Sequence, residues 1–299
     1  MRYSKSPITI PEQIKKLKDR GLSFTDETKA ANYLNNISYY RLRAYTYPFQ
    51  DNNNPTHLFI QEISFEDIIN LYIFDRRLRM LIFNAIEKIE ISLRTQIIYH
   101  YSLEYGAFWH LNSDLYNNTV YYTEQINLLQ SEITRSNETF IKHYLNTYNE
   151  PIEPPCWMSL EISSMGLLSK MFSNLKKEKC KNAITAYFGL KNVDILTNWI
   201  HCLSVIRNIC AHHGRVWNRR LPKIAIPYKT LFLFADNKQI FNNKLYAYLC
   251  CILYILNIIS PEHDFKNNLL NLMKKCPLKQ EKEMGFPENW DQEKLWVSL

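Results

Sequence analysis

Apolar residues recur at helical spacing along most of this chain, and this periodicity is the strongest constraint on its fold. The clearest case is the segment 64–101, which opens with the capping-box-like run Ser64-Phe65-Glu66-Asp67. One helical stripe of that segment carries Leu71, Leu78, Ile82, Ala85, Ile89 and Leu93. The chain has only six glycines and no sustained strand alternation, which argues against a turn-rich β protein. The sequence therefore predicts an all-α helical bundle.

Helix start and stop signals continue along the rest of the chain. They predict helices at 11–21, 25–36, 121–148, 179–189, 193–213, 242–259 and 263–275. The stiff connector Pro151-Ile152-Glu153-Pro154-Pro155 must end the helix before it, because proline cannot continue a helix. Ile224-Ala225-Ile226 is the one place where a short extended stretch is expected.

Three regions are expected along the chain. An N-terminal helical and aromatic extension, 1–55, ends at the turn-forming run Asp51-Asn52-Asn53-Asn54-Pro55. A helical core follows at 64–276. The last segment, 277–299, is predicted to be a charged tail that docks through Trp290 and Trp296.

The run Arg207-Asn208-Ile209-Cys210-Ala211-His212-His213-Gly214 sets an arginine, an amide and an imidazole at one predicted helix end. Helical periodicity places Arg207 on the apolar stripe of the helix 193–213, where a charge needs a reason. Asn208 and His212 are four residues apart and share the neighbouring polar stripe with His201. A long Arg207 side chain at the edge of the stripe would converge on them.

These residue types suit RNA cleavage without a metal or another cofactor. Arg207 would clamp the scissile phosphate, His212 would act as general acid or base, and Asn208 would orient them. A structural alternative explains the same residues. In it, the histidines suit the negative end of the helix dipole, Gly214 caps the helix, and Arg207 pairs with a buried acid.

Asp75 is the acid that periodicity places near the apolar stripe of the helix 64–101, so it is expected to need a cation. Arg207 is the obvious candidate, and Asp75 would then orient its guanidinium from behind. Arg76 and Arg77 are nearer competitors. Glu90 and Arg94 form a separate, favourable i,i+4 pair.

The net charge of +7 is mild, but its placement is uneven. No Asp or Glu occurs between Ile195 and Ala235, a window that also includes Lys223 and Lys229. Five polar residues of this window are candidate RNA contacts: His213, Arg215, Asn218, Arg219 and Arg220. A second cluster, with Lys176 and Lys177 as candidates, extends over Lys170, Lys176, Lys177, Lys179 and Lys181. Basic clusters are also common as solvated helix faces.

An aromatic block, 39–49, mixes rings with cations near the N-terminus. This block contains Tyr39, Tyr40, Arg41 and Arg43. Proteins that bind single-stranded RNA combine such rings, which stack on bases, with such cations, which pair with phosphates. The alternative is a tyrosine-rich packing clamp.

Seven cysteines without any C-x-x-C predict neither a disulfide framework nor a zinc ribbon, and a reducing cytoplasm fits them best. A zinc site from Cys202, Cys210, His212 and His213 matches no closed ligand set, so no metal is expected. The N-terminus lacks the apolar core of a signal peptide, and the apolar run 246–259 is too short to span a bilayer.

Four blocks of the chain, in order, resemble the Abi-like abortive-infection family of the AbiD and AbiF type. They are Ser38 to Phe49, Leu71 to Arg94, Pro155 to Trp157 with Gly166 to Ser169, and Arg207 to Arg219. The resemblance implies a HEPN-type domain, a class of all-helical proteins that cut or bind RNA. It also implies a 2′,3′-cyclic phosphate product, a homodimer with facing motifs, and permits Glu87 or Glu90 near the site. HEPN toxins silenced by nucleotidylation carry a tyrosine where this chain has Gly214, which makes that control route doubtful.

The sequence thus favours a cytoplasmic, metal-independent endoribonuclease of phage defence. One alternative is a non-catalytic protein that holds a small structured noncoding RNA as a ribonucleoprotein, as resemblance to the AbiF group suggests. Another is a toxin-like protein that acts through a second protein. The same arginines would serve binding and cleavage, so residue types alone leave these alternatives open.

Overall fold

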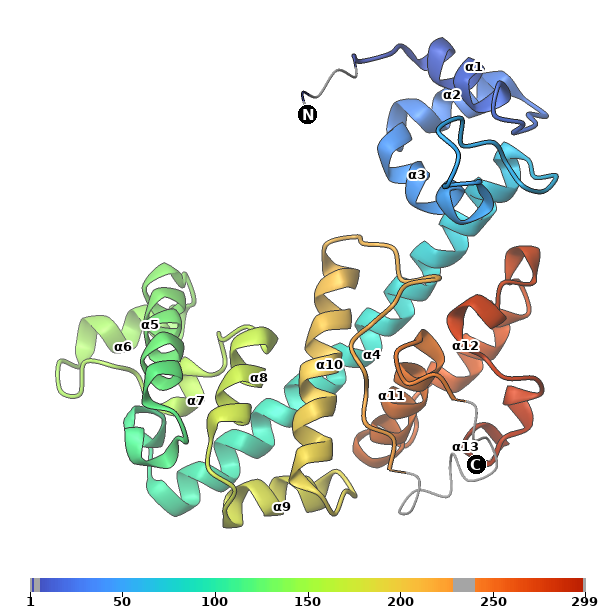
Figure 1. Cartoon of the computed structure of the whole chain (residues 1–299). Coiled ribbons are helices and arrows are strands. Elements are labelled where there is room, and N and C mark those ends of the chain that lie inside the picture. The colour runs from blue at the N-terminus through green and yellow to red at the C-terminus, as the bar shows by residue number, and fades with distance from the viewer. Residues whose placement is uncertain (1, 3–5, 228–239, 298–299) are drawn as a thin grey trace. The chain divides into compact units, whose positions relative to one another are not determined.

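The computed structural model describes residues 2, 6–227 and 240–297, and this part of the chain is almost entirely helices and their connections (Figure 1). Within these ranges there is no strand, and only isolated bridges join extended residues. The all-α prediction is confirmed. No helix in the described ranges is both long and apolar enough to cross a membrane.

The chain is divided into two compact units. The first unit consists of Met1–Arg79 and Asn271–Glu281, and the second consists of Met80–Leu270 and Lys282–Leu299. The boundary falls inside the long helix α4 (Phe65–Tyr105), so the loop 51–55, expected to end an extension, lies within the first unit. The structure places 277–281 in the first unit and the rest of the expected tail in the second.

The first unit contains α1 (Ile10–Lys18), α2 (Glu27–Asn36), α3 (Tyr39–Thr46) and the first turns of α4. Side chains that accept backbone N–H bonds fix the helix starts: Thr9 caps α1, Asp26 caps α2 and Ser38 caps α3. The helices predicted at 11–21 and 25–36 are confirmed, each with its start or end shifted by one to three residues.

Asp75 lies on the inward face of α4 and is fully buried. Arg79, one turn later on the same face, forms a buried ion pair with it. The Tyr45 hydroxyl donates to the same carboxylate at 2.6 Å and accepts from Arg79 at 3.1 Å. Burial and the Asp75 charge raise the pKa of Tyr45. The buried cation beside Asp75 is therefore Arg79, which corrects the expectation that Arg207, Arg76 or Arg77 pairs with it.

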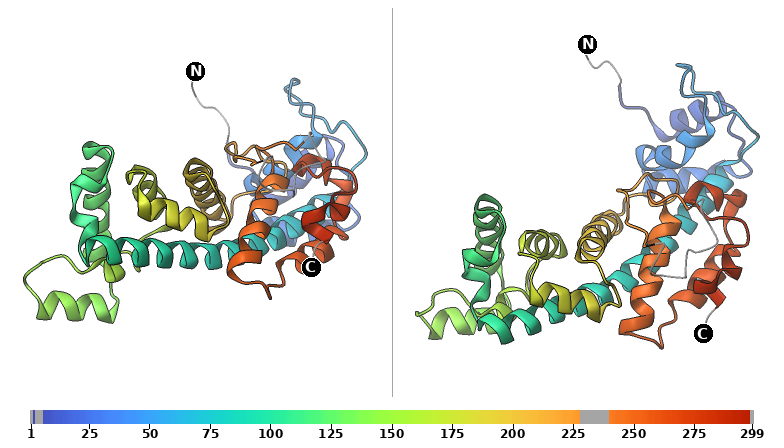
Figure 2. Two further views of the ribbon diagram at one scale, coloured as in Figure 1. Left: turned by 90° about the horizontal axis from the view of Figure 1, so that it is seen from below. Right: turned by 60° about the horizontal axis from the view of Figure 1, so that its bottom comes forward.

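In the second unit, α5 (Thr119–Arg135), α8 (Met165–Asn174) and α10 (Val193–Ala211) stand side by side on one side of α4 (Figure 2). The apolar stripe of α4 is buried, with Ile86, Ile89 and Leu93 almost inaccessible. The buried helix α11 (Leu245–Ile259) packs on α10, where Tyr254 meets Trp199 edge to face. This layer positions the end of α10.

The segment predicted as one helix over 121–148 forms two helices, α5 and α6 (Thr139–Thr147). The break falls at Ser136, whose hydroxyl accepts from the N–H of Glu138 at 3.2 Å. Serine and asparagine compete with the helical backbone through such local bonds, which explains why apolar spacing missed the break. The proline connector separates α6 from α7 (Cys156–Ser159), as predicted.

Further α-helices in the described part of the chain are α9 (Lys179–Tyr187), α12 (Phe265–Met273) and α13 (Lys294–Val297). Trp290 and Trp296 surround Tyr246, and the Trp296 indole donates to the Tyr246 hydroxyl at 3.0 Å. The predicted docking of this tail segment is confirmed.

We expect Asp75→Ala to lower the free energy of unfolding by about 3–5 kcal/mol, because it leaves the buried Arg79 guanidinium unpaired. The exposed pair Lys18–Glu27 supplies the control, and Glu27→Ala should cost less than about 1 kcal/mol. Chemical denaturation of the full chain measures both.

The losses of unfolding free energy caused by Asp75→Ala and by Arg207→Ala should add in the double mutant, because the two residues have different partners. A double mutant that loses much less than the sum would contradict these pairings.

His110 is fully buried in the second unit, and neither ring nitrogen has a hydrogen-bond partner among the residues described. Burial alone lowers the pKa of its imidazole to about 4. An unfolded histidine takes up its proton near about pH 6.5. Between these values the unfolded chain binds more protons than the folded chain, so stability falls as the pH drops through this window.

His110→Phe should remove that loss while keeping a ring in the site. Between about pH 7 and about pH 5, the unfolding free energy of the parent should fall by about 2 kcal/mol more than that of the variant. Denaturation at the two pH values measures the difference. Equal falls would show that the pKa of His110 is the same in the folded and the unfolded chain and would contradict this account.

Candidate functional site

The end of α10 carries the arginine, amide and imidazole that the sequence predicts to form a site. The N–H of Gly214 donates to the carbonyl of Ile209 at 2.8 Å, and that of His213 donates to Cys210 at 3.1 Å. This is the bond pattern of a Schellman cap, in which His213 takes the left-handed position with φ 57°. A non-glycine residue there is strained, and such strain often accompanies functional sites.

Gly214 therefore has a different role from the one expected. It lies one position beyond the left-handed residue, and a Cβ added to it would lie 3.1 Å from Ile209 Cγ2 and 3.2 Å from the Ile209 carbonyl oxygen. The glycine allows the chain to fold back closely against the last turn of α10.

The segment after the cap is tied to α10 and α11. Val216 and Trp217 are buried, and the Tyr248 hydroxyl donates to the Pro222 carbonyl at 2.7 Å. Ala225, inside the stretch expected to be extended, donates its N–H to the Asn198 side chain and accepts from the Trp199 indole, both at 2.6 Å. These side-chain bonds, in place of a sheet, hold this segment.

Arg207 lies on α10 facing α4, with its side chain 30% exposed. Its Nε lies 3.5 Å from the Glu90 carboxylate, and one terminal nitrogen donates to the Asn208 side chain at 3.3 Å. The guanidinium carbon lies 5.5 Å from the Phe83 ring centre. Arg207 therefore meets Asn208, one of the two residues on which it was predicted to converge, and the acid behind Arg207 is Glu90. Within residues 6–227 and 240–297, no hydrogen bond or ion pair joins Arg207 to His212.

Glu90 serves two guanidinium groups. Arg94 donates to one carboxylate oxygen at 2.9 Å, while Arg207 approaches the other. Arg94 also donates to the Ser163 carbonyl at 2.9 Å, which joins α4 to the start of α8. The predicted Glu90–Arg94 pair is confirmed. The contact with Arg207 and the link to Ser163 join residues far apart in sequence, which explains why helical spacing did not show them.

An open cavity of about 800 Å³ lies beside this cluster. Four glutamates, two arginines, three serines, one asparagine and two apolar residues line it: Glu90, Glu132, Arg135, Ser136, Asn137, Glu138, Phe140, Glu161, Ile162, Ser163, Ser164 and Arg207. Arg207 is the cation that α10 contributes. Its exposed part therefore faces space large enough for a polar ligand.

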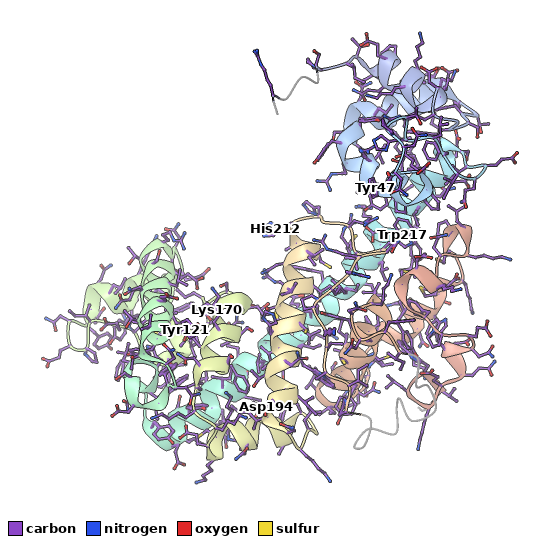
Figure 3. The ribbon with its side chains drawn as sticks, viewed as in Figure 1. Tyr47, Tyr121, Lys170, Asp194, His212 and Trp217 are labelled. Atoms are coloured by element: carbon purple, nitrogen blue, oxygen red, sulfur yellow. The ribbon has the colours of Figure 1, made fainter. Side chains whose placement is uncertain are left out.

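His212 and Asn208 are exposed on the outer stripe of α10, and Figure 3 shows His212 at the free end of that helix. Within residues 6–227 and 240–297, no hydrogen bond holds the His212 ring. The structure thus brings Arg207 and Asn208 into contact and leaves His212 reachable by a ligand.

The other candidate contacts in the acid-free window lie around the cap. Arg219 and Arg220 are exposed, as is His213. Arg215 stacks its guanidinium on Trp217 at 5.4 Å and donates to the Asn218 carbonyl at 3.2 Å. Lys229 lies outside the described residues. Two exposed arginines therefore follow the site directly along the chain.

The second lysine cluster is partly neutralised. Lys177 forms an ion pair with Asp194 at 2.6 Å, and Lys179 pairs with Glu104 at 3.1 Å. Burial lowers the pKa of Lys181 to about 8. Lys176 is exposed.

The aromatic block belongs to the first unit. Tyr40 is 85% exposed, whereas the Tyr39 hydroxyl accepts from Arg20 at 3.1 Å. Arg43 stacks on Tyr47 and donates to Gln50. Arg41 is exposed. The block combines both roles that its composition suggested, with packing contacts inside and an exposed ring outside.

For metal binding, the described ranges contain no group of three or more His, Cys, Asp or Glu side chains suitably placed. Cys202 and Cys210, from the zinc alternative, are buried.

Arg94→Ala should lower the free energy of unfolding by about 3–5 kcal/mol, because it removes the buried partner of Glu90. Arg207→Ala should cost less than about 1 kcal/mol, because that side chain is part-exposed and its ion pair is long. Chemical denaturation compares the two. Equal losses would make Arg207 a structural cation.

A family model described as Abi-like protein matches residues 32–218, more than half of the chain and nearly all of the four blocks that carry the resemblance. No curated protein and no solved structure matches the chain significantly.

Proposed function

Because the chain belongs to the Abi-like protein family, which implies abortive infection as a defence against phage, we propose that it is a metal-independent endoribonuclease of the HEPN type. The observation that supports this most is the orientation of the Arg207 guanidinium. Glu90 holds its Nε edge and Asn208 holds one terminal nitrogen, so the guanidinium is oriented toward an open cavity.

The reaction follows from these groups. A 2′-hydroxyl gives its proton to the His212 imidazole as its oxygen attacks the adjacent phosphorus. Arg207 forks onto the phosphate oxygens and stabilises their growing charge, and Asn208 fixes the fork. The bond to the 5′-oxygen breaks, and this oxygen takes up a proton. The products are a 2′,3′-cyclic phosphate and a 5′-hydroxyl.

A homodimer with facing motifs would supply a second imidazole as proton donor to the leaving oxygen. One His212 would then act as base and the partner's His212 as acid. Phosphate-pairing cations near the reaction would come from the exposed Arg219 and Arg220.

A second candidate is stable RNA binding without cleavage, as a ribonucleoprotein with a small structured RNA. The exposed arginines beside the cap favour it, because they bind phosphates whether or not chemistry follows. A discrete RNA that co-purifies with the full chain and stays uncut would support this alternative.

His212→Ala should reduce RNA cleavage by about 10²-fold or more, with little change in RNA affinity, because the imidazole transfers protons and contributes little binding. The exposed His143 on α6 provides the matched control, and His143→Ala should cleave at the parental rate. Cleavage by purified chains with chelator present is the measurement. Parental activity in His212→Ala would end the enzyme proposal.

Replacing Arg215, Arg219 and Arg220 together by glutamine should weaken RNA binding and flatten its salt dependence. The slope of log K against log salt should fall by up to about 0.7 to 0.9 for each phosphate that the protein no longer neutralises. Binding titrations over a range of salt give this slope. An unchanged slope would move the RNA surface to Lys176 or to the aromatic block around Tyr40.

A further inference from the structure

A second cavity, of about 520 Å³, opens between α5 and α8 on the layer that carries the candidate site. Figure 3 labels Tyr121 and Lys170, which line it, and His201 reaches it from α10. Its volume lies within the usual range of small-ligand pockets, about 300–1,000 Å³. Its lining is mostly amides and hydroxyls, together with one leucine, one glutamate, one lysine and one histidine.

The inner wall of this cavity is a fixed amide network. Asn174 donates to the Asn118 carbonyl and accepts from the Asn118 N–H, both at 3.0 Å. Gln125 donates to the Lys170 carbonyl at 3.2 Å, which fixes the direction of its amide. Both side chains are more than nine-tenths buried. The Gln125 oxygen receives only a 3.5 Å bond from Asn174, so it retains capacity to accept from a ligand.

The rim of the cavity carries two exposed apolar side chains, and a lysine and a histidine lie on the neighbouring elements. Tyr121 is 57% exposed and Leu128 is 47% exposed. Lys170 and His201 are exposed on the neighbouring elements. An exposed ring beside a phosphate-pairing charge is the combination that binds one unpaired nucleotide. Glu124 at the mouth would repel a phosphate on its own side, which leaves the Lys170 side for it.

The cavity also lies in line with the candidate site. His201, Asn208 and His212 fall on one stripe of α10, since seven and eleven residues return a helix to nearly the same face. His201 precedes Asn208 by about 10 Å along the axis, at roughly 1.5 Å per residue. An RNA strand that follows this exposed stripe from the cap would reach the cavity within a few nucleotides.

We propose that this cavity is a nucleotide subsite of the RNA strand that enters the candidate cleavage site. The base stacks on Tyr121 and Leu128 and donates to the Gln125 oxygen, while its phosphate meets Lys170 and His201. The path of the RNA strand from the cavity to the cleavage site rests on the proposed function. The binding of one nucleotide in the cavity rests on the cavity alone.

The test uses the full chain with two probes, adenosine 5′-monophosphate and a short single-stranded oligoadenylate. Tyr121→Ala should weaken binding of both probes by about tenfold, because one base–ring stack is removed. Tyr121→Phe keeps the ring and should bind as the parent does. Tyr99→Ala, which removes an exposed tyrosine of α4 outside the cavity, should also leave binding unchanged.

The outcomes separate this inference from the proposed function. Monophosphate binding that depends on Tyr121 in a chain that cuts no RNA would keep the nucleotide pocket and reject the enzyme. Parental binding of both probes by Tyr121→Ala would overturn the subsite even if the chain cuts RNA. Weaker monophosphate binding with unchanged oligoadenylate binding would assign the cavity to a free nucleotide and overturn the strand path.

Discussion

The Glu90 carboxylate is the interaction on which the candidate site depends. One of its oxygens binds the buried Arg94, which in turn ties α4 to the start of α8. The other holds the Nε edge of Arg207 on α10. Glu90 therefore binds two arginines at once: Arg94, which helps to hold the helices together, and Arg207, which faces the cavity. This arrangement limits the rotation of the guanidinium without using all of its donors.

The shape of the α10 terminus follows from a second constraint. Trp217 and the bonds from Asn198 and Trp199 hold the returning segment against the helix, and Gly214 allows the close approach. His213 consequently takes the left-handed position. The strained backbone lies one residue after His212, whose exposed imidazole stands at the end of α10 and precedes the exposed Arg219 and Arg220 along the chain.

The helical fold was predictable because apolar spacing and capping residues act locally. The start of α4 at Ser64 and Phe65 and the docking of Trp296 could be read from the sequence. The break at Ser136 could not be predicted, because a local hydrogen bond from the Glu138 N–H to the Ser136 hydroxyl interrupts a segment whose apolar spacing continues on both sides.

The candidate site was predictable in part. Arg207 and Asn208 lie on neighbouring stripes of α10, and the length of the Arg207 side chain lets them meet, as predicted. The i,i+4 spacing also allowed Arg79 as a partner of Asp75, whereas the contacts of Asp75 with Tyr45 and of Arg207 with Glu90 depend on packing. Asp75 meets Arg79 one turn away and Tyr45 from another helix, and Arg207 meets Glu90 across two helices. Periodicity shows that a buried charge needs a partner, but it does not show which one.

The most direct test of the proposed cleavage is the chemistry of RNA ends. RNA incubated with the purified chain in the presence of chelator should carry 2′,3′-cyclic phosphates at the new 3′ ends and hydroxyls at the new 5′ ends. The product is fixed by attack of the 2′-oxygen, so it reports the reaction itself. New 5′ ends that carry phosphates would contradict an Arg207–His212 cleavage site. So would RNA that the protein binds tightly but leaves intact.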